Sequence, residues 1–177
     1  DDFVFRGPVI GPLAKKDLID TLTTLDPSES FSDFEPNAFG FSVDPIETNR
    51  VWFFIRPRGR FTKSYNHPVF GNVEPTNEEL IAPPEARSII WKDDKTIRYQ
   101  SVGYVMDRYT GDTTNGMGAV FGLFHHMGIA GMDDGIGSVT NRALQWLSSR
   151  VLPEGMLPKS YSKEEDIPSW WTDKRRG

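Results

Sequence analysis

The sequence predicts an α+β domain with a strongly curved, mostly antiparallel sheet whose open side is closed by helices. A helical pattern of apolar residues near the amino end is followed by several β-rich runs. Pro57 and Gly59 interrupt the longest of these runs, and inside a sheet such residues mark an edge, a bulge or a bend. Aromatic residues make up 12% of the 177 residues, which is enough to line a pocket.

The first helix is expected over residues 13–25, because its leucines recur at helical spacing and Asp26-Pro27 ends the run. These leucines are Leu18, Leu22 and Leu25. Residues 1–12 are expected to form an extended arm, since two Gly-Pro pairs interrupt it and the residue before a proline avoids the helical region.

Two β-rich regions should supply most of the sheet. Residues 50–62 place apolar or aromatic side chains on both faces, so both faces are expected to be covered. Strands are expected over 86–91 and 96–108, joined by a tight hairpin turn at 92–95. The polar stretch 63–84 between the two regions is a long excursion and a candidate lid.

Two more helices are expected towards the carboxyl end. One carries the apolar stripe of Val120, Leu123, Phe124 and Met127 and ends at Gly128, and the other covers 138–151. In the loop that follows the amino-terminal helix (13–25), four phenylalanines are expected to plug one end of the core. They are Phe31, Phe34, Phe39 and Phe41.

Composition excludes several classes of function. The net charge of −5 is spread along the chain without a basic face, which argues against nucleic acid as a partner. The absence of cysteine rules out disulfides, a thiol nucleophile and a cysteine zinc site. No run approaches the roughly 20 apolar residues that a membrane span requires, so the chain is not expected to cross a membrane.

Four segments carry a family resemblance. They read GPLAKKDLIDTL (11–22), NAFGFSVDP (37–45), RVWFFIRPRGRF (50–61) and GYVMDRYTGDTTNGMGAVFGLFHHMGI (103–129). They resemble the SnoaL-like branch of the NTF2-like superfamily, most closely the versions found in plastid-bearing algae. The resemblance covers residues 7–130 and implies a cone-shaped sheet with an inner cavity. With it, the chain divides into the arm 1–12, an NTF2-like domain 13–152 and a carboxy-terminal docking tail 153–177.

The resemblance implies a catalytic residue at Asp107, whose place on the last strand is similar to that of the catalytic carboxylate in the family's cyclases and isomerases. An apolar cavity there would raise the pKa of the carboxyl group. Strand alternation puts Tyr99 on the same face, as a hydrogen-bond donor to a carbonyl oxygen, although a bulge would reverse this. The alternatives are that Asp107 closes an ion pair with a nearby arginine and that Tyr99 packs in the core.

No cofactor and no metal are expected. His125 and His126 are consecutive on a helix, so their side chains diverge by about 100° and cannot grip one metal ion together. The resemblance points the same way, since the family's carbonic anhydrases tend to carry two serines after such a pair, where this chain has Met127-Gly128.

The tail combines two large aromatic side chains with three cations, a mixture typical of protein interfaces and of segments that touch an anionic membrane surface. Together with two phenylalanines of the arm, these residues are expected to dock other protein subunits. They are Phe3, Phe5, Trp170, Trp171, Lys174, Arg175 and Arg176. The alternative is that the tryptophans fold back over the domain's own core.

Two functions are compatible with these observations. The first, which is favoured, is a non-enzymatic interaction subunit attached to a larger assembly; the likeness to algal forms suggests a photosynthetic membrane complex and a plastid location. The second is a small-molecule enzyme of the cyclase, isomerase or dehydratase type that uses Asp107. A small apolar ligand in the cavity is a further expectation.

Overall fold

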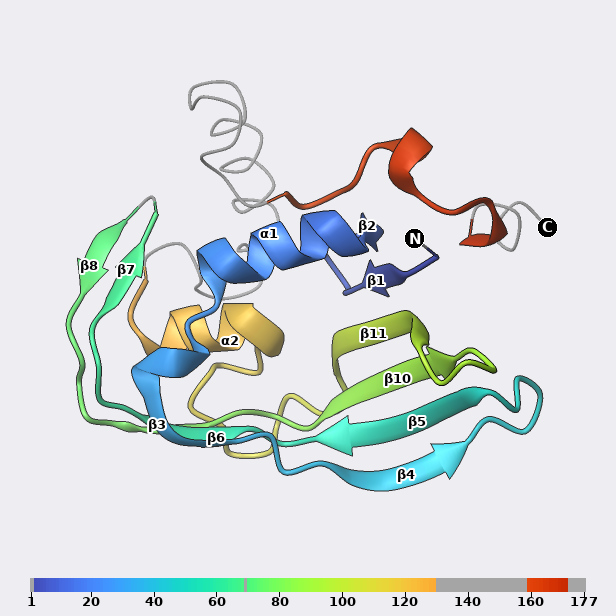
Figure 1. Cartoon of the computed structure of the whole chain (residues 1–177). Coiled ribbons are helices and arrows are strands. Elements are labelled where there is room, and N and C mark those ends of the chain that lie inside the picture. The colour runs from blue at the N-terminus through green and yellow to red at the C-terminus, as the bar shows by residue number, and fades with distance from the viewer. Residues whose placement is uncertain (1, 69, 130–158, 172–177) are drawn as a thin grey trace.

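The computed structural model describes residues 2–68, 70–129 and 159–171 (Figure 1), and it confirms the α+β class. The largest sheet has six strands in the order β2-β1-β11-β10-β5-β4, and a second sheet has the order β3-β6-β9. Within these residues every strand pair is antiparallel except β1 with β11. Strands β2 and β4 are the edges of the large sheet, so it is curved but not closed.

The strands are short at the amino end and longest in the central hairpin. Their bounds are β1 (Val4–Arg6), β2 (Leu13–Ala14), β3 (Phe31–Glu35), β4 (Phe39–Val43), β5 (Arg50–Ile55), β6 (Arg58–Phe61), β7 (Tyr65–His67), β8 (Gly71–Val73), β9 (Glu79–Ile81), β10 (Glu85–Trp91) and β11 (Ile97–Val105). The helices are α1 (Lys15–Leu25) and α2 (Ala119–His126), with 3-10 turns at Ser28–Ser30 and Glu164–Asp166. The predicted helix over 138–151 lies outside the described residues.

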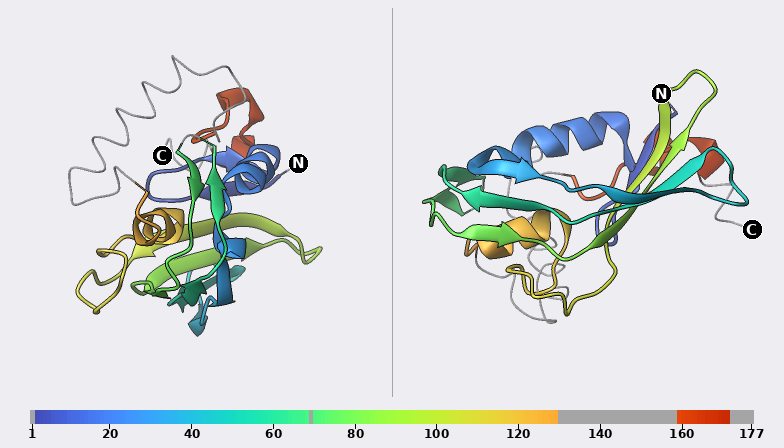
Figure 2. Two further views of the ribbon diagram at one scale, coloured as in Figure 1. Left: turned by 90° about the vertical axis from the view of Figure 1, so that its left-hand side faces the viewer. Right: turned by 90° about the horizontal axis from the view of Figure 1, so that it is seen from below.

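The sheet bends where Pro57 interrupts the predicted run 50–62. Strand β5 ends at Ile55 and pairs with β10, whereas β6 begins at Arg58 and belongs to the second sheet. Proline has no N–H to donate to a ladder, so the pairing partner changes there. Figures 1 and 2 show β5 and β6 as one bent layer, from whose far end the β7–β8 hairpin rises steeply. The predicted curvature is therefore present.

The predicted hairpin of β10 and β11 is confirmed. Its turn is closed by the N–H of Lys92, which donates to the carbonyl of Thr96 at 2.9 Å. Strand β11 contains an extra residue between Ser101 and Tyr104, where Gly103 has a φ of +79°. Such a bulge reverses which side chains face each side of the sheet. The strand also stops at Val105, before Asp107.

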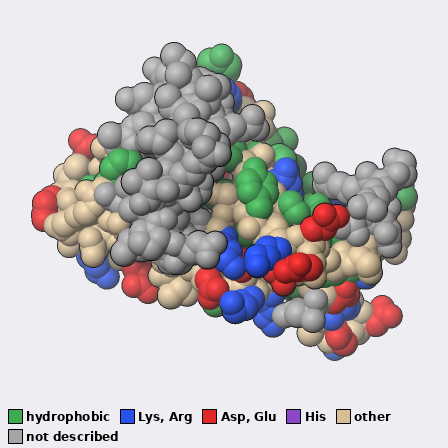
Figure 3. Space-filling model, turned by 90° about the horizontal axis from the view of Figure 1, so that it is seen from above, with side chains coloured by type: hydrophobic (Ala, Val, Ile, Leu, Met, Phe, Trp, Pro, Cys, Tyr) green, Lys and Arg blue, Asp and Glu red, His purple; other side chains and the backbone are tan. Residues whose placement is uncertain are grey.

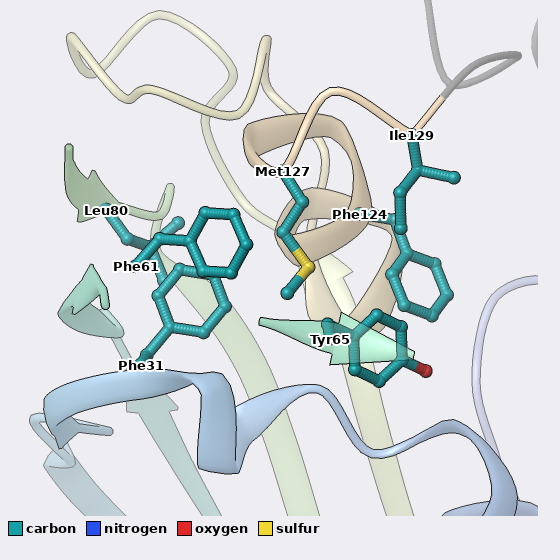
Figure 4. Packing of buried hydrophobic residues seen from close by; sticks show 7 residues of the cluster. All are labelled: Phe31, Phe61, Tyr65, Leu80, Phe124, Met127 and Ile129. Carbon is teal, nitrogen blue, oxygen red and sulfur yellow. The ribbon is translucent and has the colours of Figure 1, made fainter. Parts of the chain in front are cut away.

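The main core lies between β3, β6, β9, the β7–β8 hairpin and α2 (Figure 4). It contains Phe31, Phe61, Tyr65, Leu80, Phe124, Met127 and Ile129. The predicted apolar stripe of α2 faces this core, and the helix is followed by Gly128 with a φ of +73°, as its sequence indicates. Burial of Tyr65 raises the pKa of its hydroxyl to about 12.

Three expectations about burial are wrong. Phe39 and Phe41 do not plug the core but are 47% and 64% exposed, because they lie on the edge strand β4. Trp52 is 39% exposed, so the two faces of β5 are not both covered. The stretch 63–84 is not a loose lid: it forms β7, β8 and β9 and contributes Tyr65 to the core.

Helix α1 starts two residues later than expected because Leu13–Ala14 pair with β1. Its buried side chains are polar, Asp17 and Thr21, while Leu22 is 50% exposed. The Asp17 carboxylate accepts a hydrogen bond from Lys159 Nζ at 2.6 Å and one from Ser162 Oγ at 2.5 Å. Burial favours the protonated form of Asp17, but these two donors outweigh it and lower its pKa. The segment 159–171 is thereby fixed to α1.

Candidate functional site

An open cavity of about 1260 Å³ lies between α1, α2, the amino-terminal arm and the β10–β11 hairpin. Figure 1 shows both helices on the same side of the layer formed by β5 and β6. The cavity walls are largely apolar. They include Phe5 and Ile10 of the arm, Leu18 and Leu22 of α1, Val105 of β11, and Val120 of α2. The leucine face of α1, predicted from its spacing, thus lines the cavity, and its last member, Leu25, also packs against the main core.

Glu85, the first residue of β10, brings a carboxylate to this cavity although its side chain is only 1% exposed. The N–H of Ala119, at the start of α2, donates to Glu85 Oε1 at 2.7 Å. A carboxylate is stabilised at this end of a helix because the free N–H groups there carry partial positive charge. Glu85 therefore ties the sheet to the amino end of α2.

The backbone around this contact is tightly specified. A Cβ on Gly118 would lie 2.7 Å from Val105 and 3.2 Å from the Glu85 carboxylate, so only glycine fits there. The next residue, Ala119, has a φ of +49°, which a residue with a side chain rarely adopts. Strained backbone of this kind is commonly found at binding and catalytic sites.

Arg87 lies two residues after Glu85, on the same face of β10, and also lines the cavity. Its Nη2 is 3.3 Å from Glu85 Oε2, and its side chain is 24% exposed. The Nε of Arg87 is buried and has no hydrogen-bond partner within the described residues. Among the described residues, this ion pair thus lies in the cavity wall, and the terminal nitrogens of Arg87 bond only to Glu85.

The loop before α2 is ordered by Asp112, another residue of the cavity wall. Its Oδ1 accepts hydrogen bonds from the N–H groups of Thr114 and Gly116 at 2.9 and 2.8 Å and from the Thr114 hydroxyl at 3.0 Å. Partial burial opposes ionisation of this carboxyl, but the hydrogen bonds dominate and lower its pKa. Asp112 thus shapes the wall through its own loop.

The residue implied as catalytic, Asp107, lies beyond the end of β11 and is exposed. Its Oδ1 accepts the N–H of Tyr109 at 2.9 Å, a turn contact, and it is not among the cavity-lining residues. The sequence left open an ion pair of Asp107 with Arg108, Arg98, Arg56 or Arg58. Arg56 bonds to the Thr110 carbonyl, Arg58 to Glu79 and Arg98 to Asp2, and Arg108 has no ion pair within the described residues.

Tyr99 is 6% exposed and does not line the cavity. Its ring stacks on Trp171 at 5.1 Å and lies 5.1 Å from the guanidinium of Arg50. It belongs to a second cluster of buried residues with Val4, Ile90 and Ile167. The structure therefore does not bring Tyr99 and Asp107 together, and the bulge in β11 breaks the alternation that placed them on one face.

The residues predicted to dock a partner lie in different parts of the structure. Phe5 lies on β1 and lines the cavity, and Phe3, just before β1, is partly buried. Trp170 donates from Nε1 to the Asp2 carbonyl at 3.2 Å, and the Arg98 guanidinium covers its ring at 4.3 Å. Trp170 and Trp171 are partly buried and pack against the chain's own second core cluster, as the alternative interpretation of the sequence describes. Lys174, Arg175 and Arg176 lie outside the described residues.

The two residues that define the polar part of the cavity, Glu85 and Arg87, were not predicted. The available signal was a carboxylate and a guanidinium two residues apart at the start of a strand that is otherwise apolar except for Ser88, directly after Pro83-Pro84. Charged residues inside a buried strand usually occur where they are paired. Their pairing with α2 depends on tertiary contacts, which the strand pattern does not contain.

Within the described residues no group of three potential ligands could hold a metal ion, and no helix is long and apolar enough to cross a membrane. Viewed from above, the visible face carries acidic and basic side chains side by side with hydrophobic ones between them (Figure 3). Charge of one sign does not dominate the part of this face that is described.

No family model and no curated protein matches the chain. Among the solved structures that match is one described as a SnoaL-like polyketide cyclase from Jannaschia sp. CCS1. The two chains are 17% identical, the TM-score is 0.38, and the match covers 57% of this chain and 62% of that one. The chain thus matches less than two thirds of that protein's length.

Proposed function

We propose that the chain binds a small, largely apolar molecule in the cavity between α1 and α2. The proposal follows the small-molecule alternative from the sequence, but it places the polar contact at Arg87, which is held by Glu85. The observation that carries it is an open cavity with largely apolar walls and an ion pair of a buried Glu85 and a partly exposed Arg87. Sites for small molecules typically combine apolar walls with a few fixed polar groups.

The exposed apolar surface of α1 supports the proposal. Leu22 lines the cavity and is still 50% exposed. Apolar surface in water costs about 25 cal/mol per Å² relative to burial, so a ligand that covers this wall would gain from the same term. Catalysis by Asp107 and Tyr99 stays a prediction, and neither residue contributes to this cavity.

The test uses N-phenyl-1-naphthylamine (NPN), an uncharged probe that fluoresces when it leaves water. We expect saturable binding by the wild-type chain and a loss of affinity of at least about fivefold in Leu22→Lys, because the variant introduces a cation into the apolar wall. Ile19→Lys is the matched control: Ile19 is 52% exposed on the same helix but does not line the cavity. Equal affinities in the two variants, or no saturable binding by the wild type, would contradict the proposal.

A second candidate function is attachment to another protein subunit, as the sequence favours. Its support is β4, in which all five residues are exposed and none is charged. Phe41 and Val43 of this edge strand are 64% and 59% exposed. Sheet edges in free proteins are usually protected, and an unprotected edge can pair with an extended segment of another chain. The algal photosynthetic membrane complex and the plastid location rest on the resemblance and stay predictions.

Attachment can be tested by native gel electrophoresis of the tagged chain in extracts of the cells that produce it. We expect the wild type to migrate in a larger complex and Phe41→Lys to migrate as the free chain, because a charge at the edge opposes strand addition. Ile19→Lys should stay in the complex. Migration of the wild type at the size of the free chain, or retention of Phe41→Lys in the complex, would rule out this role for β4.

A further inference from the structure

The acidic side chains of the cavity wall already have hydrogen-bond donors. Asp26 Oδ1 accepts the N–H of Ser28 at 2.9 Å, and Asp112 accepts from Thr114 and Gly116. Glu85 accepts from Ala119 with one oxygen and faces Arg87 with the other. These carboxylates therefore have little need of a donor from a ligand.

The arginines of the cavity wall, in contrast, have few hydrogen-bond acceptors among the described residues. Within the described residues, Arg87 has a single hydrogen bond, to Glu85, and its Nε is buried without a partner. Arg108 lines the cavity too, is exposed, and has no ion pair in the described part of the chain. A Cβ on Gly116 would come within 2.9 Å of Arg108 Cβ, so the loop lies directly against this arginine. Among the charged side chains of the cavity wall, the arginines are therefore the ones that can still donate hydrogen bonds to a ligand.

The charge around Arg87 limits how negative a ligand can be. The Glu85 carboxylate is partly neutralised by the N–H of Ala119, so Arg87 keeps part of its positive charge. A second negative charge on the ligand would be repelled by Glu85 at close range in a site of low polarity. The planar guanidinium matches the two oxygens of a carboxylate, and its Nη1 makes no hydrogen bond within the described residues.

We infer that the ligand is an apolar monocarboxylate, whose carboxylate is bound by Arg87 with Arg108 as the second cation of the site. The inference rests on the proposed function and adds the chemical class of the ligand. Leu18, Leu22 and Val120 would contact its apolar body. Glu85 acts as a positioning residue, because it holds Arg87 and the start of α2 without being accessible itself.

Displacement of bound NPN by decanoate and by 1-decanol tests the inference, since the two probes share one chain and differ in the head group. We expect the wild type to bind decanoate about tenfold more tightly than decanol, as a charge-assisted hydrogen bond to a partly buried arginine predicts. In Arg87→Gln this ratio should fall to about one. Lys16→Gln removes the same charge from a side chain that is 84% exposed and outside the cavity, and it should leave the ratio unchanged.

Arg87→Gln leaves the buried Glu85 without its cation, so the double variant Glu85→Gln with Arg87→Gln provides a second measurement without an unpaired charge. The ratio should be about one there too. A wild type that binds NPN but does not prefer decanoate, or an Arg87→Gln protein that keeps the preference, would overturn the inference and leave the proposed function intact. A wild type that binds no NPN would refute the proposed function itself.

Discussion

Replacing Phe61 by alanine is expected to lower the free energy of unfolding by about 3–5 kcal/mol. The side chain is fully buried, and its ring centroid lies 5.4 Å from that of Phe31 on the neighbouring strand. Removal of the ring loses its burial and leaves a cavity between β6 and α2 that the surrounding strands can only partly fill. Urea unfolding followed by circular dichroism measures the change.

Phe41→Ala is the control for this measurement. Phe41 stacks on Phe53 with ring centroids 5.3 Å apart, but it is 64% exposed on the edge strand. We expect a cost of no more than about 1.5 kcal/mol, the range for an aromatic pair contact. If Phe61→Ala costs no more than Phe41→Ala, the main core does not lie between the second sheet and α2.

The variant Glu85→Ala is expected to cost about 3 kcal/mol of unfolding free energy, the lower end of the range for breaking a buried ion pair. The value is at the lower end because Arg87 is 24% exposed and can regain some solvent. The loss has two parts: the cation of Arg87 loses its described partner, and the N–H of Ala119 loses its acceptor. Glu85→Gln should cost less, since its amide oxygen can still accept from Ala119.

An exposed ion pair, Arg58 with Glu79, shows how much of the stability loss comes from burial of the pair and how much from the pairing itself. Arg58 and Glu79 lie 2.8 Å apart, with side chains 56% and 47% exposed, and Glu79→Ala should cost less than about 1 kcal/mol. Thermal and urea unfolding of the three variants compares them directly. Equal losses for Glu85→Ala and Glu79→Ala would show that the Glu85 contact with α2 contributes nothing, and would remove the basis for its positioning role.

Burial was the least predictable property of this chain. Phe39 and Phe41 are large apolar residues typical of a core, yet they are exposed because β4 is the edge strand of the large sheet among the described residues. Glu85 carries a charged side chain of the kind usually found at the surface, yet it is buried because the start of α2 covers it. In both cases the outcome depends on a neighbour that is distant in sequence, and hydrophobicity alone does not specify that neighbour.

The sequence by itself determined the local elements: the α1 leucine spacing, the β10–β11 hairpin, the break at Pro57 and the end of α2 at Gly128. Their physical basis is the periodicity and backbone preference of a few adjacent residues. Three features are visible only in the tertiary structure. They are the bulge in β11, the packing of segment 159–171 on Tyr99 through Trp171, and the position of Glu85, Arg87 and α2 around the same cavity. Each of these depends on pairing and packing between segments far apart in the chain, where many arrangements satisfy the same local pattern.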